Sequence, residues 1–182
     1  MNFVKFFLAL TIAVVLIAPQ STFSQNRMDV GGELSLAMPM GDFGDGFNTG
    51  FGFTGVFTYH LDPQLALIGS IGYISFGSKV DGISFSTMPI NAGVHYKFNP
   101  GQKFQPYIGA ETLFFMSSST VDLFGFKSSV SSTDFGFTPI VGAAFPISPK
   151  LEIRANLKYH ILFTSGSSTT FLGIGGGLHY VL

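Results

Sequence analysis

Apolar and polar residues alternate along residues 151–163 (LEIRANLKYHILF), and Leu162 is the only position that departs from the pattern. Side chains of a β-strand point alternately to opposite faces, whereas at helical spacing these residues would scatter around the axis. The segment therefore predicts a strand with one apolar and one polar face. The apolar face holds Leu151, Ile153, Ala155, Leu157, Tyr159, Ile161 and Phe163, and the polar face holds Glu152, Arg154, Asn156, Lys158 and His160.

Seven further segments show the same two-residue period. They lie at residues 28–38, 50–61, 65–76, 87–98, 104–116, 133–147 and 169–182. Each is about a dozen residues long, which exceeds the usual 5–6 residues of a globular strand and suits a tilted strand that crosses a bilayer. The chain therefore predicts eight strands.

The connections between these strands alternate in character. Those after the second, fourth and sixth strands are tight and contain proline, at residues 62–64, 99–101 and 148–150. The others, at residues 39–49, 77–85, 117–132 and 165–168, are longer or richer in glycine and serine. Short turns at one end and longer loops at the other are typical of an antiparallel up-and-down transmembrane β-barrel, whose turns and termini are periplasmic. Pro139 falls inside the sixth strand, where it predicts a bulge or lost pairing because proline cannot donate to the ladder.

Composition distinguishes a membrane barrel from a soluble one. Charged residues make up 10% of the chain, against about 25% in typical soluble domains, and aromatic residues make up 15%. A soluble barrel hides its apolar face, whereas a membrane barrel turns it toward lipid, so scarce charge favours the membrane. The net charge of −1 gives no reason to expect a nucleic-acid partner, and the absence of cysteine excludes disulfides and thiolate metal sites.

The N-terminus has the features of a cleavable signal peptide. Lys5 precedes an apolar run over residues 6–18, and small residues Thr22 and Ser24 are spaced for cleavage before Gln25. The apolar run is shorter than the roughly 20 residues of a comfortable membrane span, although an uncleaved anchor helix remains the alternative. We therefore expect a signal peptide at residues 1–24 and an exported all-β domain at residues 25–182.

The segments GGELSLAMPMGDF, FQPYIGAETLFF and GIGGGLHYVL resemble the small eight-stranded outer-membrane β-barrel proteins of Gram-negative bacteria. These porin-like barrel domains are related in architecture to the OmpA transmembrane domain and OmpX. The resemblance spans the predicted mature chain. It implies residence in the outer membrane, contact with outer-membrane lipids and lipopolysaccharide, and insertion by the barrel-assembly machinery. It specifies fold better than activity, and we expect a monomer.

Polar side chains on the predicted inner faces form the candidate site. An eight-stranded barrel is just wide enough to be filled by side chains, and buried charges must be paired. We therefore expect a lumen network of ion pairs rather than a metal or cofactor site, and five residues of the 151–163 strand facing lipid. The network residues are Glu33, His60, His95, Lys97, Glu111, Asp134, Glu152, Arg154, Lys158, His160 and His179. The lipid-facing residues are Leu151, Ile153, Leu157, Tyr159 and Ile161.

These observations favour a non-enzymatic barrel with a structural, adhesive or narrow-permeation role. The first alternative is a passive porin-like channel for small or hydrophobic solutes. A more remote alternative is a lipid-modifying enzyme, for which His160 with Ser165 or Ser167 is the candidate pair. The glycines at residues 173–177 lack the lysine and helix of a phosphate-binding loop, so we expect them to make room for bulky lumen neighbours. The apolar residues 123–126 are expected to fold back over the barrel mouth.

Overall fold

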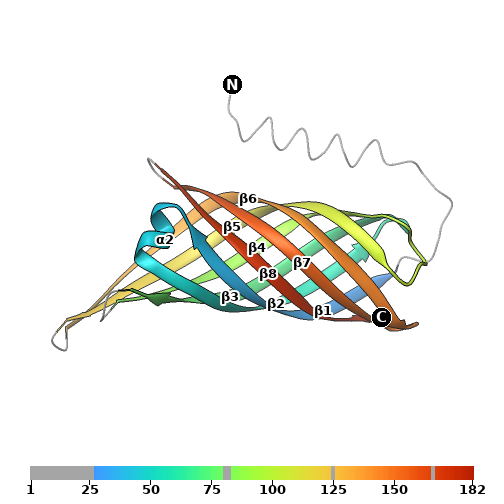
Figure 1. The fold of residues 1–182 in the computed structure, drawn as a ribbon, viewed down its shortest axis with the longest axis horizontal. Coiled ribbons are helices and arrows are strands. Elements are labelled where there is room, and N and C mark those ends of the chain that lie inside the picture. Colours follow the sequence, from blue (N-terminus) through green and yellow to red (C-terminus); the bar gives the residue numbers. More distant parts are fainter. Residues whose placement is uncertain (1–26, 80–82, 124–125, 165–166) are drawn as a thin grey trace, which may run out of the picture.

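The chain forms a closed barrel of eight antiparallel strands, each paired with its sequence neighbours, and β8 closes the barrel against β1 (Figure 1). The computed structural model describes residues 27–79, 83–123, 126–164 and 167–182. The strands are β1 (Met28–Met40), β2 (Phe47–His60), β3 (Leu65–Ser78), β4 (Ile83–Lys97), β5 (Gln105–Leu123), β6 (Phe126–Ser148), β7 (Leu151–Thr164) and β8 (Ser167–Val181). The prediction of an eight-stranded up-and-down barrel is confirmed. The signal-peptide prediction for residues 1–24 lies outside the described residues.

The two ends of the barrel differ. One end, here called the turn end, carries the connections 61–64, 98–104 and 149–150 together with the C-terminus. The opposite end, here called the hairpin end, carries the short helix α2 (Asp42–Gly46) and the far ends of β5 and β6 (Figure 1). The expected segregation of tight turns to one end is therefore present.

The hairpin end contains more strand than the sequence predicts. Residues 117–123 and 126–132, predicted as parts of a long loop, continue β5 and β6, which stay paired up to Leu123 and Phe126. Serine, threonine and valine tolerate extended backbone, and continued pairing satisfies their backbone N–H and C=O groups. Because β7 first pairs with β6 at Phe135, residues 126–134 of β6 have no neighbour on that side among the described strands. The side chains of residues 123–126 lie outside the described set.

Pro139 interrupts the β6–β7 pairing as predicted. On the β5 side it stands opposite Ala110 in an unbroken ladder. On the β7 side the ladder passes from Phe137 to Ile140 without a pair between them, although the register on both sides of the gap is the same. The missing N–H of proline therefore costs local pairing and leaves the strand alignment intact.

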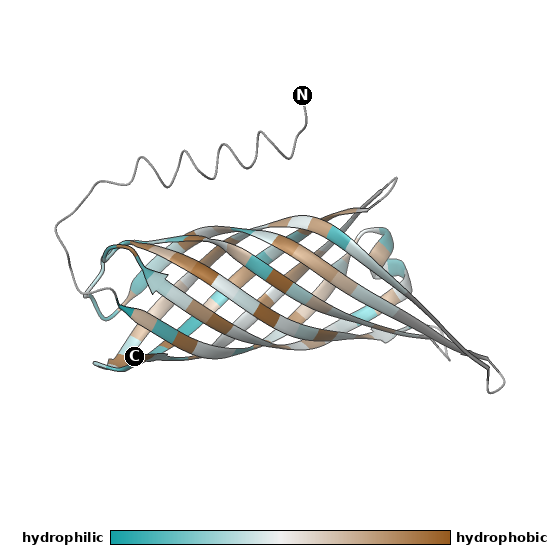
Figure 2. Ribbon diagram, turned by 180° about the vertical axis from the view of Figure 1, so that it is seen from behind, coloured by the Kyte–Doolittle hydropathy of each residue, from teal (hydrophilic) through white to brown (hydrophobic). Residues whose placement is uncertain are grey.

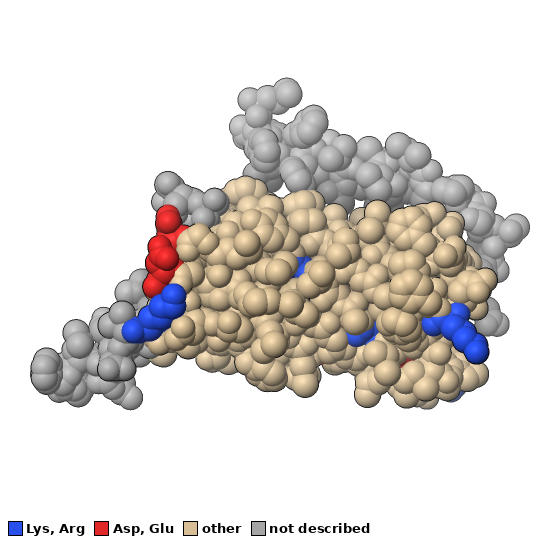
Figure 3. Space-filling view, in the orientation of Figure 1, with Lys and Arg blue, Asp and Glu red and all other residues tan. Residues whose placement is uncertain are grey.

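The outer surface is an apolar band. Figure 2 shows hydrophobic and hydrophilic positions interspersed along the strands, many large hydrophobic side chains are exposed, and Figure 3 shows charged side chains gathered mainly near the two ends on the face shown. Ile153, Leu157 and Tyr159 of β7 are exposed, and their neighbours Leu151 and Ile161 on the same face are half-buried. No helix among the described residues has the length and apolar character needed to cross a membrane. So large an exposed apolar surface fits a lipid environment.

Candidate functional site: the barrel lumen

Asp29 of β1 is the centre of a buried ion-pair cluster in the turn-end half of the lumen. Its Oδ2 accepts hydrogen bonds from Arg154 Nη2 and His60 Nε2, both at 2.8 Å, and its Oδ1 lies 3.2 Å from His179 Nδ1. Asp29 is almost fully buried. A carboxylate taken out of water needs such partners, and here they come from β2, β7 and β8.

Arg154 of β7 spans the lumen with its guanidinium group. It donates to Glu152 Oε1 at 2.6 Å, to Thr58 Oγ1 at 2.9 Å and to Asp29 Oδ2 at 2.8 Å. The planar fork of arginine suits several fixed acceptors at once. Glu152 also accepts from Lys97 Nζ at 3.1 Å, so strands β1, β2, β4 and β7 are joined by one set of charged contacts.

Glu33 extends the cluster toward the middle of the barrel. Its Oε2 accepts from Lys158 Nζ and Asn156 Nδ2, both at 3.2 Å, and its Oε1 lies 3.2 Å from His179 Nε2. His179 therefore stands between Asp29 and Glu33, and both carboxylates belong to β1. These contacts cross the seam at which β8 closes the barrel.

A second, smaller group joins His95 of β4 and Glu111 of β5. His95 Nε2 lies 3.0 Å from Glu111 Oε1, and its ring stacks on Tyr107. Gly109 is required beneath this ring, because a Cβ there would overlap His95 Cδ2. Among the described residues, Glu111 Oε2 and Asn91 Oδ1 are buried side-chain oxygens without a hydrogen-bond partner.

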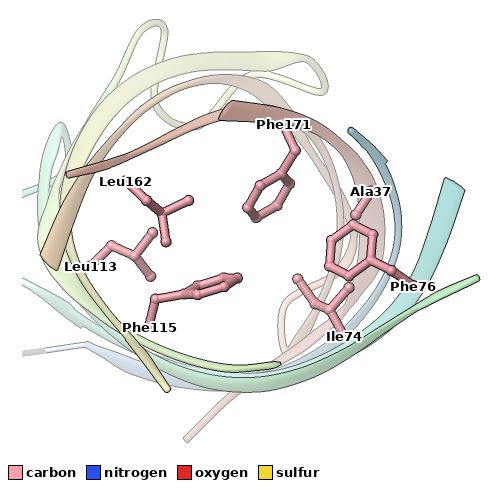
Figure 4. Close-up of a cluster of buried hydrophobic side chains, with 7 residues drawn as sticks. All are labelled: Ala37, Ile74, Phe76, Leu113, Phe115, Leu162 and Phe171. Atoms are coloured by element: carbon pink, nitrogen blue, oxygen red, sulfur yellow. The ribbon is translucent and has the colours of Figure 1, made fainter. Parts of the chain in front are cut away.

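The hairpin-end half of the lumen is apolar, contrary to the expectation of a polar lumen throughout. Figure 4 shows the apolar cluster, whose side chains point into the barrel from several strands: Ala37, Ile74, Phe76, Leu113, Phe115, Leu162 and Phe171 (Figure 4). Phe43 of α2, Phe47 and Phe85 pack against it. Leu162, the exception in the β7 alternation, is one of its inward members. Aromatic and branched side chains fill this half by close packing, where no hydrogen bonds are needed.

His160 lies at the boundary between the two halves. Its ring stacks on Phe171 with centroids 4.3 Å apart, and its Nδ1 lies 3.0 Å from Thr138 Oγ1. The candidate partner Ser165 and the side chain of Ser167 lie outside the described residues. In the described part of the chain, no group of three or more His, Asp or Glu side chains is arranged to hold a metal ion.

Cavities in the lumen are small, apart from one at its turn end. Two cavities inside the barrel each measure about 20 Å³, where a water molecule needs roughly 10–15 Å³. At the turn end a larger cavity of about 730 Å³, here called the vestibule, is bordered by Arg27, Lys103 and Gln105 and has Asp29, Lys97 and Glu152 among its lining residues. Water therefore reaches the edge of the ion-pair cluster.

The structure brings most of the expected network residues together. Glu33, His60, Lys97, Glu152, Arg154, Lys158 and His179 join the ion-pair cluster, His95 and Glu111 form the second group, and His160 lies at the boundary. Asp134 lies apart from them. Its Oδ2 accepts from Ser132 near the hairpin end, and no described ion pair connects it with the cluster.

The sequence prediction missed the central residue of the cluster. Asp29 is absent from the predicted lumen network, although it follows the two-residue period of Glu33 and therefore lies on the same inner face. Thr58 and Asn156 were also omitted, and they too occupy polar positions of predicted inner faces. Only some of the glycines at 173–177 make room for lumen side chains, as the sequence predicts for all of them. A Cβ at Gly175 would meet Asn156, whereas one at Gly177 would meet the backbone of Gly32.

Comparison with known proteins identifies the family. The profile of the outer membrane protein β-barrel domain matches residues 7–181. The chain belongs to this family. Its localisation is therefore the bacterial outer membrane.

Solved structures with the same fold include several small outer-membrane proteins. Neisserial surface protein A matches with 18% identity and a TM-score of 0.65, over 86% of this chain and 99% of its own. Ail, the attachment invasion locus protein of Yersinia pestis, matches with 16% identity and a TM-score of 0.63, over 87% and 100%. OprG from Pseudomonas aeruginosa matches with 12% identity and a TM-score of 0.58, over 90% and 98%. Comparison with curated protein sequences gives no match. At these identities the likeness establishes the fold alone.

Proposed function

We propose that the protein is a non-enzymatic outer-membrane barrel whose lumen is sealed and whose role is structural or adhesive. The observation that carries this proposal is the filling of the lumen by two successive layers. The ion-pair cluster occupies the turn-end half, and the apolar cluster occupies the hairpin-end half. A solute would have to displace both a charged network and a set of packed aromatic rings.

The adhesive part of the proposal rests on the hairpin end. We assign this end to the cell exterior and the turn end to the periplasm, because tight turns are periplasmic in such barrels. The hairpin of β5 and β6 then projects outward, and residues 126–134 of β6 offer an unpaired strand edge among the described strands. Such an edge can accept an extended segment of another protein. Ail, one of the proteins with this fold, is named for attachment.

Conductance in planar lipid bilayers tests the seal. The purified full chain should insert without producing steps of ionic current. A reproducible open state would reject the sealed lumen and favour the alternative of a passive channel for small or hydrophobic solutes. Replacing Phe76, Phe115 and Phe171 together with alanine should still give no open state, because the ion-pair cluster remains.

Adherence of intact cells tests the role of the hairpin. A variant in which residues 120–129 are replaced by Asn-Gly keeps the barrel and shortens the projecting strands, since this dipeptide favours a tight hairpin turn. Cells of a non-adherent Gram-negative host that carry the full chain should adhere to epithelial monolayers, and cells that carry the short variant should not. Equal adherence by both would restrict the proposal to a structural role.

We also propose that the protein has no enzymatic activity. His160 is buried between Thr138 and Phe171, which leaves it poorly placed to activate a nucleophile on lipid. His160→Ala should leave the lipid composition of the outer membrane unchanged in a host that carries the protein. A change in acylation that appears with the wild type and disappears with this variant would support the enzyme.

We further propose that the protein is a monomer that contacts outer-membrane lipids and lipopolysaccharide and is inserted by the barrel-assembly machinery. The support is the family and the apolar band, which is continuous around a barrel without free edges in its central part. Light scattering of the protein in detergent, corrected for bound detergent, should give the mass of one chain.

A further inference from the structure

His179 is enclosed by two carboxylates. Its side chain is fully buried, with Nδ1 3.2 Å from Asp29 Oδ1 and Nε2 3.2 Å from Glu33 Oε1. It stands over Gly31 on the neighbouring strand, where an added Cβ would overlap Nδ1 of the ring. The absence of a side chain at Gly31 thus allows the ring to lie close to β1, and both ring nitrogens face acidic oxygens.

This arrangement restricts where protons can reside. A neutral imidazole carries one N–H donor and one acceptor nitrogen, whereas an ionised carboxylate can only accept. A neutral His179 would therefore place a lone pair against a carboxylate oxygen on one side. The electrostatic repulsion between this lone pair and the carboxylate oxygen is removed if the ring carries a proton on both nitrogens, or if Asp29 or Glu33 is protonated instead.

The other contacts of the two carboxylates favour the charged ring. Asp29 accepts from Arg154 and His60 through its second oxygen. Glu33 accepts through its second oxygen from Lys158 and from Asn156 Nδ2. Donors that surround a carboxylate stabilise its ionised form. Both acids are thus held ionised from the side that His179 does not contact.

The charge count of the lumen leaves room for one such proton. The buried acids are Asp29, Glu33, Glu111 and Glu152, and the fixed cations that pair with or face them are Lys97, Arg154 and Lys158. With neutral histidines the lumen would carry one excess negative charge in a low-dielectric space. A single additional proton on His179 makes the four acids and four cations balance.

We propose that His179 is a proton-binding site, a buried imidazolium that locks β8 to Asp29 and Glu33 of β1 across the seam of the barrel. The charged or titratable groups that face it are these two acids, His60 of β2, and Glu152, Arg154 and Lys158 of β7.

The site links barrel stability to pH. A histidine whose charged form is stabilised by folding adds stability at low pH, and that stability is lost as pH rises through the range in which the folded protein releases the proton. A difference of one unit in proton affinity between the folded and unfolded states changes the folding equilibrium about tenfold. We therefore expect the folding equilibrium to weaken as His179 loses its second proton.

Nitrogen NMR of the full chain tests the site directly. Histidine ring nitrogens labelled with ¹⁵N, in lipid nanodiscs at neutral pH, should show both nitrogens of His179 protonated. His160, with only Thr138 as a hydrogen-bond partner, should remain neutral under the same conditions. A neutral tautomer at His179, or an infrared carbonyl band of a protonated acid that disappears in Glu33→Gln, would overturn the proposal.

Stability against pH provides the second test. The urea midpoint of the wild-type barrel in lipid should fall as pH rises through the titration of His179. Glu33→Gln should remove that fall, because an amide can donate to one nitrogen of a neutral ring. His160→Gln is the matched control and should keep the fall. A pH dependence that is identical in the wild type and Glu33→Gln would also overturn the proposal, even if His179→Gln fails to fold.

Discussion

Arg154→Ala tests whether the ion-pair cluster stabilises the barrel. Arg154 is 5% exposed and donates hydrogen bonds to Glu152, Thr58 and Asp29 at 2.6–2.9 Å. Removing one partner of a buried ion pair typically costs about 3–5 kcal/mol, because the remaining charge stays buried without compensation. Here two acids lose a cation at once.

The remaining contacts place the expected loss at the lower end of that range. Asp29 keeps His60 and His179, and Glu152 keeps Lys97, so neither acid is left without a donor. We therefore expect a loss of about 3 kcal/mol in the free energy of unfolding. Urea unfolding in phospholipid vesicles, followed by tyrosine fluorescence, measures it.

Arg27→Ala is the matched control. Arg27 borders the vestibule and is exposed, and the hydrogen bond described for its side chain is a long one of 3.5 Å to the Pro149 carbonyl. Exposed contacts of this kind contribute little, so the control should change stability by less than about 1 kcal/mol. If Arg154→Ala costs no more than Arg27→Ala, the cluster contributes nothing to stability and the reasoning is wrong.

Three further substitutions probe other parts of the barrel. Leu157→Lys on the lipid face should cost about 2–4 kcal/mol near the bilayer midplane in the same vesicle assay, and a neutral result would contradict the inside-out assignment. Gly109→Ala should cost about 1–3 kcal/mol because its methyl group would overlap His95, whereas Gly69→Ala, which meets open space, serves as control; equal effects would reject the packing argument. Phe171→Ala should cost about 3–5 kcal/mol by leaving a cavity in the apolar cluster, and a loss below 1 kcal/mol would show that the cluster is loosely packed.

The alternation of residues 151–163 could be read from the sequence because side-chain direction in a strand is a local property. Each residue points opposite to its neighbour whatever the rest of the chain does. The same reasoning placed His95 and Lys97 inside and predicted the pairing gap at Pro139, which depends only on a missing N–H. Strand number and the end at which each turn lies followed from counting such segments.

The extent of the strands could not be read in this way. Residues 117–132 are rich in serine and lack strong alternation, so they suggest a loop. In the structure they form strand because β5 and β6 satisfy each other's backbone groups, a condition that depends on the partner and not on the segment alone. The helix α2 likewise occurs within a segment expected to be loop.

Period and composition are properties of the chain, so they already predict a membrane barrel with polar side chains at many inward positions. Which of those side chains meet depends on the closed barrel. Asp29 and Arg154 are far apart in the sequence, and they meet because closure of β8 on β1 brings three strands to one height in the lumen. The division into an ion-pair cluster and an apolar cluster has the same origin, since the inward-facing side chains of β1, β3, β5, β7 and β8 in the apolar cluster meet only in the closed barrel.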